Sequence, residues 1–392
     1  MTMIGGEVAA GFEPVREAFA ENFARHGDIG AAVCVYWHGR PVVDLWGGIA
    51  DPDTGRPWTR DTLQLVYSAT KGATATAVHL LVQRGELDLD APVATYWPEF
   101  AANGKADILL RWLLSHQAGL VTLDQPVPLT EALAWHPMAS ALAAQRPVWT
   151  PGTAHGYHGR TWGWLVGEVI RRVSGRTPGR FFAEEIAAPL GLDFFIGLPA
   201  DERDRVSRMV HSKPEVDFTT VPPELIPEDL RDQVIAWSDP NSLSNRAYTV
   251  TAPSAIDFNS PEVQAAELPA SNGIGTARGL ARMYAALIGE VDGLRLFLPE
   301  TLMLATKEQA AGIDQVLVAP SRFSSGYQLP TTDNPMNGPN AFGHNGRGGS
   351  LAFADSETGI AFAYTMNHII SGDSDARAGT LVCAVLDSLS RQ

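Results

Sequence analysis

Ser68-Ala69-Thr70-Lys71 places a serine three residues before a lysine, at the start of a run that is typical of a helix. Side chains three apart on a helix share a face, so the hydroxyl and the amine can approach hydrogen-bonding distance. Lysine is otherwise rare, with 4 lysines among the 29 basic residues of the chain. The pair predicts an activated nucleophile, against the alternative of a capping serine followed by a surface lysine.

The residues around the pair carry no charge. An extended run from Thr62 precedes it, and a helical run of small and then apolar residues follows it as far as Gly85. No carboxylate occurs between Thr62 and Glu86. A lysine buried among Ala, Thr and Val loses hydration, which lowers its pKa. A helix N-terminus next to Ser68 also favours a developing alkoxide. These surroundings favour the catalytic interpretation of the pair.

The composition is that of an ordinary globular protein. The chain has 392 residues, of which 45% are hydrophobic and 19% charged, and a length of this order predicts two subdomains. The net charge of −15 argues against nucleic acid or an anionic membrane as a partner. No apolar run approaches the roughly 20 residues of a membrane span. The first residues also lack a signal-peptide pattern, so the expected compartment is the cytoplasm. Cys34 and Cys383 lie in apolar runs and are expected to be buried thiols.

Strand-like and helical patterns alternate in a distinctive order. Strands are predicted near both chain ends, at 31–37, 41–47, 351–355 and 359–366, and helices at 13–25, 72–84, 107–116, 161–174, 181–190, 277–289 and 376–390. This order predicts an α/β (α+β) fold with an antiparallel sheet built from both chain ends and covered by terminal helices. Residues 1–66 and 272–392 would form the sheet domain, and 67–271 a mostly helical domain. The active site is expected at their interface.

Residues 211–270 differ from the rest in their many prolines, which keep regular structure short. This segment is predicted either to wall or cover the site, or to be a surface excursion without a role. Five tryptophans of the inserted region are compatible with an acyl pocket or with the core, namely Trp135, Trp149, Trp162, Trp164 and Trp237. Asn245 and Tyr248 are further candidates for the pocket wall.

A second chemical element is Tyr157, in the glycine-rich loop that runs from Gly152 to Gly159. A tyrosine there can direct its hydroxyl into a cleft, and a nearby lysine ammonium would lower its pKa so that it can pass protons. The alternative is a tyrosine packed on its own loop. His155 and His158 lack nearby carboxylates or cysteines and are not expected to bind a metal.

A third element is Gly343-His344-Asn345-Gly346-Arg347-Gly348-Gly349-Ser350, which precedes the last strands. Glycines allow close approach of the backbone to a ligand, and backbone N–H groups there could stabilise an oxyanion. A glycine-rich turn between strands without a role is the alternative. The chain contains neither a phosphate-binding P-loop motif nor a Gly-x-Ser-x-Gly elbow, which argues against a nucleotide hydrolase and an α/β-hydrolase.

These three elements, in this order, resemble the serine hydrolases of the β-lactamase fold, and most of all the family VIII carboxylesterases related to class C β-lactamases and DD-peptidases. Ser68-Ala69-Thr70-Lys71 is similar to their Ser-x-x-Lys box, Tyr157-His158-Gly159 to their Tyr-x-Asn box, and His344-Asn345-Gly346 to their Lys-Thr-Gly box. The resemblance implies that Ser68 is the nucleophile and that Lys71 and Tyr157 share the proton transfer. It further implies an oxyanion hole from the backbone N–H groups of Ser68 and Arg347, and no cofactor.

Two departures from the family pattern indicate which class of substrate the chain would hydrolyse. Gly159 stands where β-lactamases carry an Asn that holds an amide, and His344 where they carry a Lys that meets the antibiotic carboxylate. The resemblance implies that the substrate is bound at His344, Asn345, Gly346 and Gly159. It also implies hydrolysis of small or medium acyl esters through an acyl-Ser68 intermediate. The alternatives are a β-lactamase, a DD-peptidase or D-aminopeptidase, an acyltransferase, and a non-catalytic binding protein. The natural ester and the oligomeric state stay open.

Overall fold

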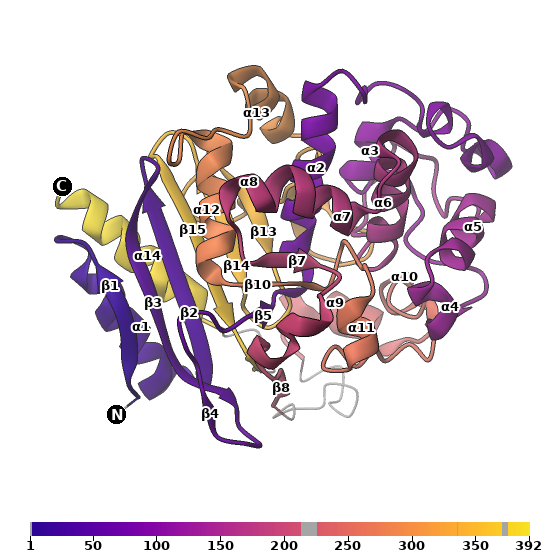
Figure 1. The fold of residues 1–392 in the computed structure, drawn as a ribbon. Helices are drawn as coiled ribbons and strands as arrows, with labels where there is room; N and C mark the ends of the chain where they lie inside the picture. The colour runs from indigo at the N-terminus through magenta and orange to yellow at the C-terminus, as the bar shows by residue number, and fades with distance from the viewer. Residues whose placement is uncertain (1, 213–225, 335, 371–374) are drawn as a thin grey trace.

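The computed structural model describes residues 2–212, 226–334, 336–370 and 375–392 (Figure 1). Its main sheet is antiparallel and joins strands from both ends of the chain. The strand order is β1 (Ile4–Val8), β3 (Arg40–Asp51), β2 (Gly30–Trp37), β15 (Ile360–Met366), β14 (Leu351–Asp355) and β13 (Ala341–Asn345), and the short β4 (Arg56–Pro57) pairs with β3. The two halves meet where β2 pairs with β15. The predicted two-ended antiparallel sheet is confirmed.

Both faces of the sheet are covered by helices, which explains why its central strands are apolar throughout. Val33 and Val35 of β2 pack in one cluster with α1 (Glu13–Arg25) and α14 (Arg377–Ser390). The alternate residues Cys34 and Tyr36 belong to the cluster that includes α12 (Ala277–Ile288) on the opposite face. Side chains alternate between the faces of a strand, so a strand buried on both sides needs hydrophobic residues at every position.

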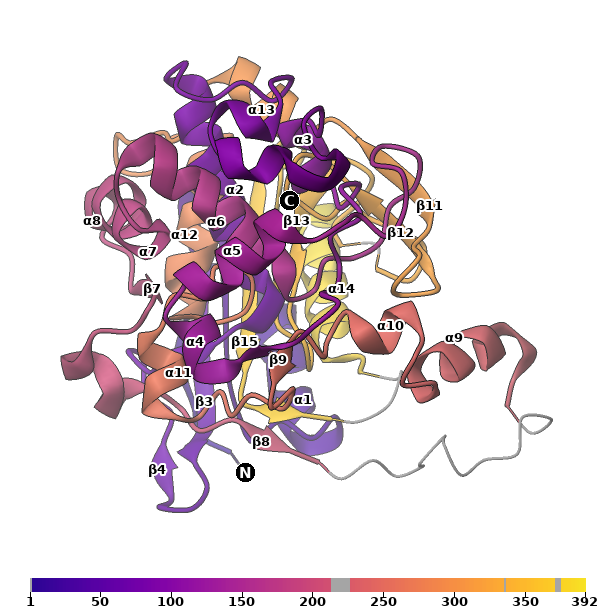
Figure 2. The same cartoon turned by 90° about the vertical axis from the view of Figure 1, so that its right-hand side faces the viewer.

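The rest of the chain is mostly helical and lies to one side of the sheet (Figures 1 and 2). Its helices are α3 (Leu110–Leu114), α4 (Leu129–Leu133), α5 (His136–Ala144), α6 (Thr161–Ser174), α7 (Pro178–Phe182), α8 (Ala188–Leu190), α9 (Glu228–Ser238), α10 (Leu243–Arg246) and α11 (Pro261–Ala265), and α13 (Pro299–Thr306) lies beyond α12. Between the two parts runs α2 (Thr70–Gln83), which contacts α6, α7 and β13 and is buried from Thr70 to Leu81. A helix in this position connects the sheet to the helical part and carries Lys71 in its first turn, directly after the turn that holds Ser68.

Short strands complete the architecture. A small antiparallel sheet of β5 (Gln64–Leu65), β10 (Gly273–Gly275) and β7 (Phe194–Ile196) lies at the start of α2. Three two-stranded pairs are β11 (Ala310–Ile313) with β12 (Pro320–Phe323), β16 (His368–Ile369) with β8 (Val210–His211), and β6 (Val127–Pro128) with β9 (Thr251–Ala252). None of the helices in the described ranges is long and apolar enough to cross a membrane.

Several sequence expectations need correction. The helix expected over 107–116 is confined to Leu110–Leu114, and the one expected over 181–190 is α7 and α8 joined by a π-helical turn at Ala183–Ala187. Cys34 is buried as expected, but Cys383, which lies on α14, is exposed. Part of the proline-rich segment, 213–225, lies outside the described residues, and the remainder forms the short elements β9, α9, α10 and α11.

Candidate active site

The turn that leads into α2 is held by hydrogen bonds from β10. The turn itself is a 3₁₀ helix, η1 (Tyr67–Ala69), in which Tyr67 has a left-handed φ of 46°. The Thr70 hydroxyl donates to the Tyr67 carbonyl at 2.5 Å and accepts from the Gly273 N–H at 2.7 Å. A non-glycine residue in this region costs about 1–2 kcal/mol, so the surrounding structure must impose it. Ser68 is thereby held at a strained turn immediately before the helix.

Lys71 lies fully buried with its amine directed at Ser68. Its Nζ is 3.4 Å from Ser68 Oγ, 3.1 Å from the Gly159 carbonyl oxygen and 3.1 Å from the Ala270 carbonyl oxygen. Burial, and then the nearby charge of Arg160, hold the pKa of Lys71 well below its usual 10.5, as the sequence predicted. A neutral amine has two N–H donors and one lone pair. With both donors on the carbonyls, the lone pair is left for the Ser68 hydroxyl proton.

Tyr157 completes a three-residue group with these two side chains. The Lys71 Nζ lies 4.7 Å from the centroid of the tyrosine ring, and Tyr157 lines the same cavity as Ser68. The expected fall in the pKa of Tyr157 is wrong: burial, and then the neighbouring Tyr248, raise it well above 10. The reason is that the tyrosine hydroxyl is itself buried, which disfavours the charged phenolate. In the resting site Tyr157 is therefore a neutral proton donor.

The Tyr157 loop is positioned by Asp314, which the sequence analysis did not single out. One carboxylate oxygen of this buried residue accepts the backbone N–H groups of Tyr157 at 2.9 Å and of Val316 and Leu317 at 2.8 Å each. The other oxygen accepts the Ser321 hydroxyl at 3.2 Å. No local motif could reveal this role, because Asp314 is far from Tyr157 in sequence and binds its main chain rather than its side chain.

We expect Asp314→Ala to lower both stability and turnover. Three buried N–H groups would lose their acceptor, and an unsatisfied buried group costs about 1–3 kcal/mol, so urea unfolding should show a loss of at least about 2 kcal/mol. Turnover of a p-nitrophenyl ester should fall because Tyr157 is no longer held. Asp314→Asn, which keeps one acceptor oxygen, should recover part of both losses.

A matched control for this change is Asp88→Ala. Asp88 also accepts a backbone N–H, that of Asp90 at 2.9 Å, but it is exposed and outside the site. It should leave turnover at the wild-type level. If Asp314→Ala retained full turnover at wild-type stability, the positioning role would be wrong.

The glycine-rich turn after β13 approaches the start of α2 closely. A Cβ atom at Gly346 would lie 2.1 Å from the Val66 carbonyl oxygen, so only glycine is compatible with this packing. The next residue, Arg347, lines the same two cavities as Ser68, and within the described part of the chain its backbone N–H has no hydrogen-bond partner. The oxyanion hole from the Ser68 and Arg347 N–H groups stays a prediction that this arrangement allows.

His344 and Gly159 lie at the site but do not present side chains to a substrate. The His344 ring is buried behind Tyr157, with 5.9 Å between ring centroids, and its Nδ1 contacts the Asn345 carbonyl oxygen at 2.7 Å. Burial, and then Lys71, lower its pKa to about 3. A Cβ atom at Gly159 would lie 2.7 Å from the ring of Tyr248, which packs where a side chain would project. Of the predicted binding positions, Asn345, Gly346 and Gly159 line cavities, whereas His344 does not line either cavity.

Two cavities meet at Ser68 and Tyr248. The first, which we call the α14 cavity, has a volume of about 750 Å³ and extends from Ser68 and Tyr157 to α14. The second, the Arg160 cavity, has a volume of about 550 Å³ and is lined mainly by residues of the helical part: Tyr67, Ser68, Gly159, Arg160, Trp237, Asn245, Tyr248, Thr249, Ser254, Ala255, Phe258, Ser271 and Arg347. An ester has two sides, and the two cavities offer a place for each.

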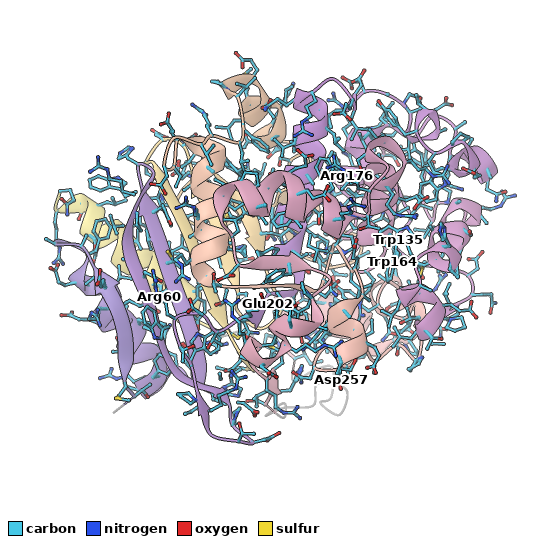
Figure 3. All side chains as sticks on the ribbon, in the orientation of Figure 1. Arg60, Trp135, Trp164, Arg176, Glu202 and Asp257 are labelled. Atoms are coloured by element: carbon cyan, nitrogen blue, oxygen red, sulfur yellow. The ribbon has the colours of Figure 1, made fainter. Side chains whose placement is uncertain are left out.

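Most of the tryptophans considered for the pocket belong to the protein interior. Trp237 lines the Arg160 cavity. Trp135 and Trp164 lie in the helical part (Figure 3), where their indole N–H groups donate to Glu168 at 2.7 Å and to the Ala132 carbonyl at 3.2 Å. Trp149 and Trp162 likewise donate to main-chain carbonyls, those of Gln117 and Leu114. An aromatic pocket wall of five tryptophans is therefore wrong.

The two histidines near Tyr157 are engaged in different hydrogen bonds. His158 accepts the Leu120 N–H at 3.0 Å through Nε2, and its Nδ1 lies 2.7 Å from the Gly156 carbonyl oxygen. His155 Nε2 lies 3.0 Å from the Ser321 hydroxyl. Their nitrogens thus serve to hold the loop that carries Tyr157.

Comparisons with known proteins show which families and structures the chain is similar to. The family model described as Beta-lactamase matches residues 15–385. The chain is 38% identical to the esterase/beta-lactamase LipL of Mycobacterium tuberculosis, over 92% of this chain and 82% of LipL. It is similar to the crystal structure of a family VIII carboxylesterase, with 37% identity and a TM-score of 0.85 over 98% of this chain and 100% of that one. EstA from Arthrobacter nitroguajacolicus Rue61a is 33% identical, with a TM-score of 0.87 over 99% of each chain.

Proposed function

The chain belongs to the Beta-lactamase family, and from this premise we propose that it is a serine carboxylesterase that forms an acyl intermediate on Ser68. Relatives described as esterases or carboxylesterases, among them LipL, support an ester substrate. The observation that carries the proposal is the Lys71 amine, which lies 3.4 Å from Ser68 Oγ with both of its remaining contacts on carbonyl oxygens. A buried amine in this geometry can accept the hydroxyl proton of Ser68.

The proposed acylation step uses the three side chains in fixed roles. Lys71 takes the Ser68 proton, and Ser68 Oγ attacks the ester carbonyl carbon while the backbone N–H groups of Ser68 and Arg347 hold the oxyanion. Tyr157 donates its proton to the leaving alcohol oxygen as the carbon–oxygen bond breaks, and the Lys71 ammonium returns a proton to Tyr157. The raised pKa of Tyr157 and the lowered pKa of Lys71 support this assignment of acid and base.

Deacylation reverses the roles with water as the nucleophile. Lys71 accepts a proton from water as the water oxygen attacks the acyl carbon. Ser68 Oγ then leaves and takes a proton from Tyr157, which the Lys71 ammonium reprotonates. The products are the free acid and the unchanged enzyme. If an alcohol enters instead of water, the same steps give acyl transfer.

The site lacks two groups that β-lactamases use to bind their substrates, which favours esters over β-lactams. His344 is buried with no side chain in either cavity, so a β-lactam carboxylate meets no ammonium there, and Gly159 offers no amide to an acylamino side chain. We expect kcat/KM for p-nitrophenyl esters of small or medium acyl chains to exceed that for nitrocefin by at least about 100-fold, which corresponds to about 2.7 kcal/mol. A panel of acyl lengths with nitrocefin and a D-Ala-D-Ala ester measures this. Nitrocefin turnover equal to the best ester would reverse the assignment.

Two further proposals concern the organisation and location of the enzyme. We propose that 1–66 with 272–392 and 67–271 act as two domains with the site between them, which agrees with the position of α2 between sheet and helices. We also propose the cytoplasm as the compartment, which cell fractionation would test.

A further inference from the structure

Arg160 extends into the Arg160 cavity beside the nucleophile. It occupies the N-cap position of α6, three residues after Tyr157, and lines the same cavity as Ser68. Its guanidinium carbon lies 6.0 Å from the ring centroid of Tyr248 and 6.0 Å from that of Phe258. Two aromatic rings therefore hold the guanidinium in place without neutralising its charge.

A second cation shares this cavity. Arg347 is exposed and also lines the cavity. Burial lowers the pKa of Arg160, and the nearby positive charge of Arg347 lowers it further. Among the described residues that line the cavity there is no Asp or Glu. Neither arginine forms an ion pair with a described residue, although arginines elsewhere do, such as Arg172 with Glu168 at 2.8 Å and Arg377 with Asp28 at 2.9 Å.

This arrangement is unusual for a protein with a net charge of −15. Arg160 is partly buried, and a guanidinium withdrawn from water is normally paired, because desolvation of an unpaired charge is unfavourable. Two like charges near one another add repulsion, which a bound anion would remove. Arginine is also the side chain best suited to bind a carboxylate, through two parallel N–H donors. Asn245, Thr249 and Ser254 provide further polar groups on the same wall.

We propose that Arg160, with Arg347, binds a carboxylate of the substrate, so that the enzyme prefers esters that carry a free acid group near the scissile bond. This inference rests on the proposed esterase function and names its substrate class. It narrows the small or medium acyl esters expected from the sequence to those that carry an acid group. The carboxylate can belong to the acyl side or to the alcohol side of the ester, and in both cases Arg160 with Arg347 would bind it.

The test compares matched pairs of esters that differ only in charge. For the acyl side, mono-p-nitrophenyl adipate is compared with p-nitrophenyl 6-methylheptanoate, and for the alcohol side, 4-(carboxymethyl)phenyl butanoate with 4-isobutylphenyl butanoate. We expect the wild type to show a ratio of kcat/KM, acidic over neutral, of at least about 10 in one pair. Arg160→Met should lower that ratio at least about tenfold, and Arg160→Lys should restore part of it. Expressing the result as a ratio removes any effect of Arg160 on Lys71.

Controls separate this inference from the function on which it rests. Arg25→Met removes an exposed arginine whose partner is Glu21, and it should leave the ratio unchanged. Thermal melting verifies that each variant is folded, and inhibition by adipate, weaker in Arg160→Met, gives a readout independent of turnover. If neutral esters are hydrolysed through Ser68 but the ratio and the adipate inhibition are the same in wild type and Arg160→Met, only the carboxylate site is overturned. If no ester is hydrolysed and Ser68 does not react, both proposals fall.

Discussion

Ser68→Ala will abolish ester hydrolysis while leaving the protein folded. Loss of the nucleophile removes the covalent route, and in other serine hydrolases such a change lowers kcat by roughly 10⁶-fold, which would place the variant below detection. Stability should change little, since alanine keeps the backbone of the strained turn and the Thr70 hydrogen bonds that hold it. Turnover of the best p-nitrophenyl ester, with thermal melting of the same samples, measures both.

A fluorophosphonate probe tests the same residue by a chemical route. The wild type should carry one phosphonyl group on Ser68, located by mass spectrometry, and Ser68→Ala should carry none. Ser390→Ala, which removes an exposed hydroxyl from the end of α14, serves as the control and should react like the wild type. Equal turnover by the wild type and Ser68→Ala, or an unlabelled serine on folded protein, would show that the site acts by other means or only binds.

Lys71→Met will reduce kcat by roughly 10²–10⁴-fold, the usual contribution of a general base. Methionine has a similar length and is suited to the apolar surroundings, so the loss reports on the amine. In the wild type the base is the neutral amine. Activity should therefore fall as pH is lowered through the depressed pKa of Lys71, because protonation occupies the lone pair. This acid limb should be absent from the pH profile of the residual activity of Lys71→Met.

The same substitution should make the protein more stable at neutral pH. Folding lowers the pKa of Lys71 below its usual 10.5, so between these two values the unfolded chain binds a proton that the folded protein has lost. Stability between these two pKa values rises with pH. At pH 7 the buried amine therefore destabilises the folded protein, and methionine would not. Lys307→Met, at an exposed position, is the matched control and should change neither activity nor melting temperature. A drop in the melting temperature of Lys71→Met with unchanged kcat would contradict both roles.

Much of the fold was predictable, because its long elements have clear periodicity. The helices at Glu13–Arg25 and Thr161–Ser174 occur with the predicted bounds, and β14 and β15 form the predicted hairpin. Prediction was weaker where tertiary contacts decide the outcome. The Leu-rich run expected to be helical over 107–116 ends at Leu114, after which Ser115 turns the chain and His116 adopts a left-handed φ of 65°.

The site was predictable only as far as its chemistry is local in sequence. Ser68 and Lys71 share one helical turn, and Tyr157 was found through its glycine-rich loop. The contribution of Asp314 to the position of Tyr157 depends on a contact between distant segments. The role proposed for Arg160 depends on the absence of an ion-pair partner among the described residues, which only the folded structure reveals. The direction of the Tyr157 pKa was wrong for a similar reason, since it depends on how deeply the tyrosine is buried in the folded protein.

The pairing of β2 with β15 has a consequence for biosynthesis. While the nascent chain grows, the N-terminal strands can form early, but the edge of β2 has no partner until Met366 has been translated. At roughly 5–20 residues per second, that delay lasts tens of seconds. An exposed apolar edge of this kind invites pairing with other chains. The exposed edge of β2 is therefore covered only when β15, near the end of the chain, pairs with it. Truncation before β15 should give an insoluble product.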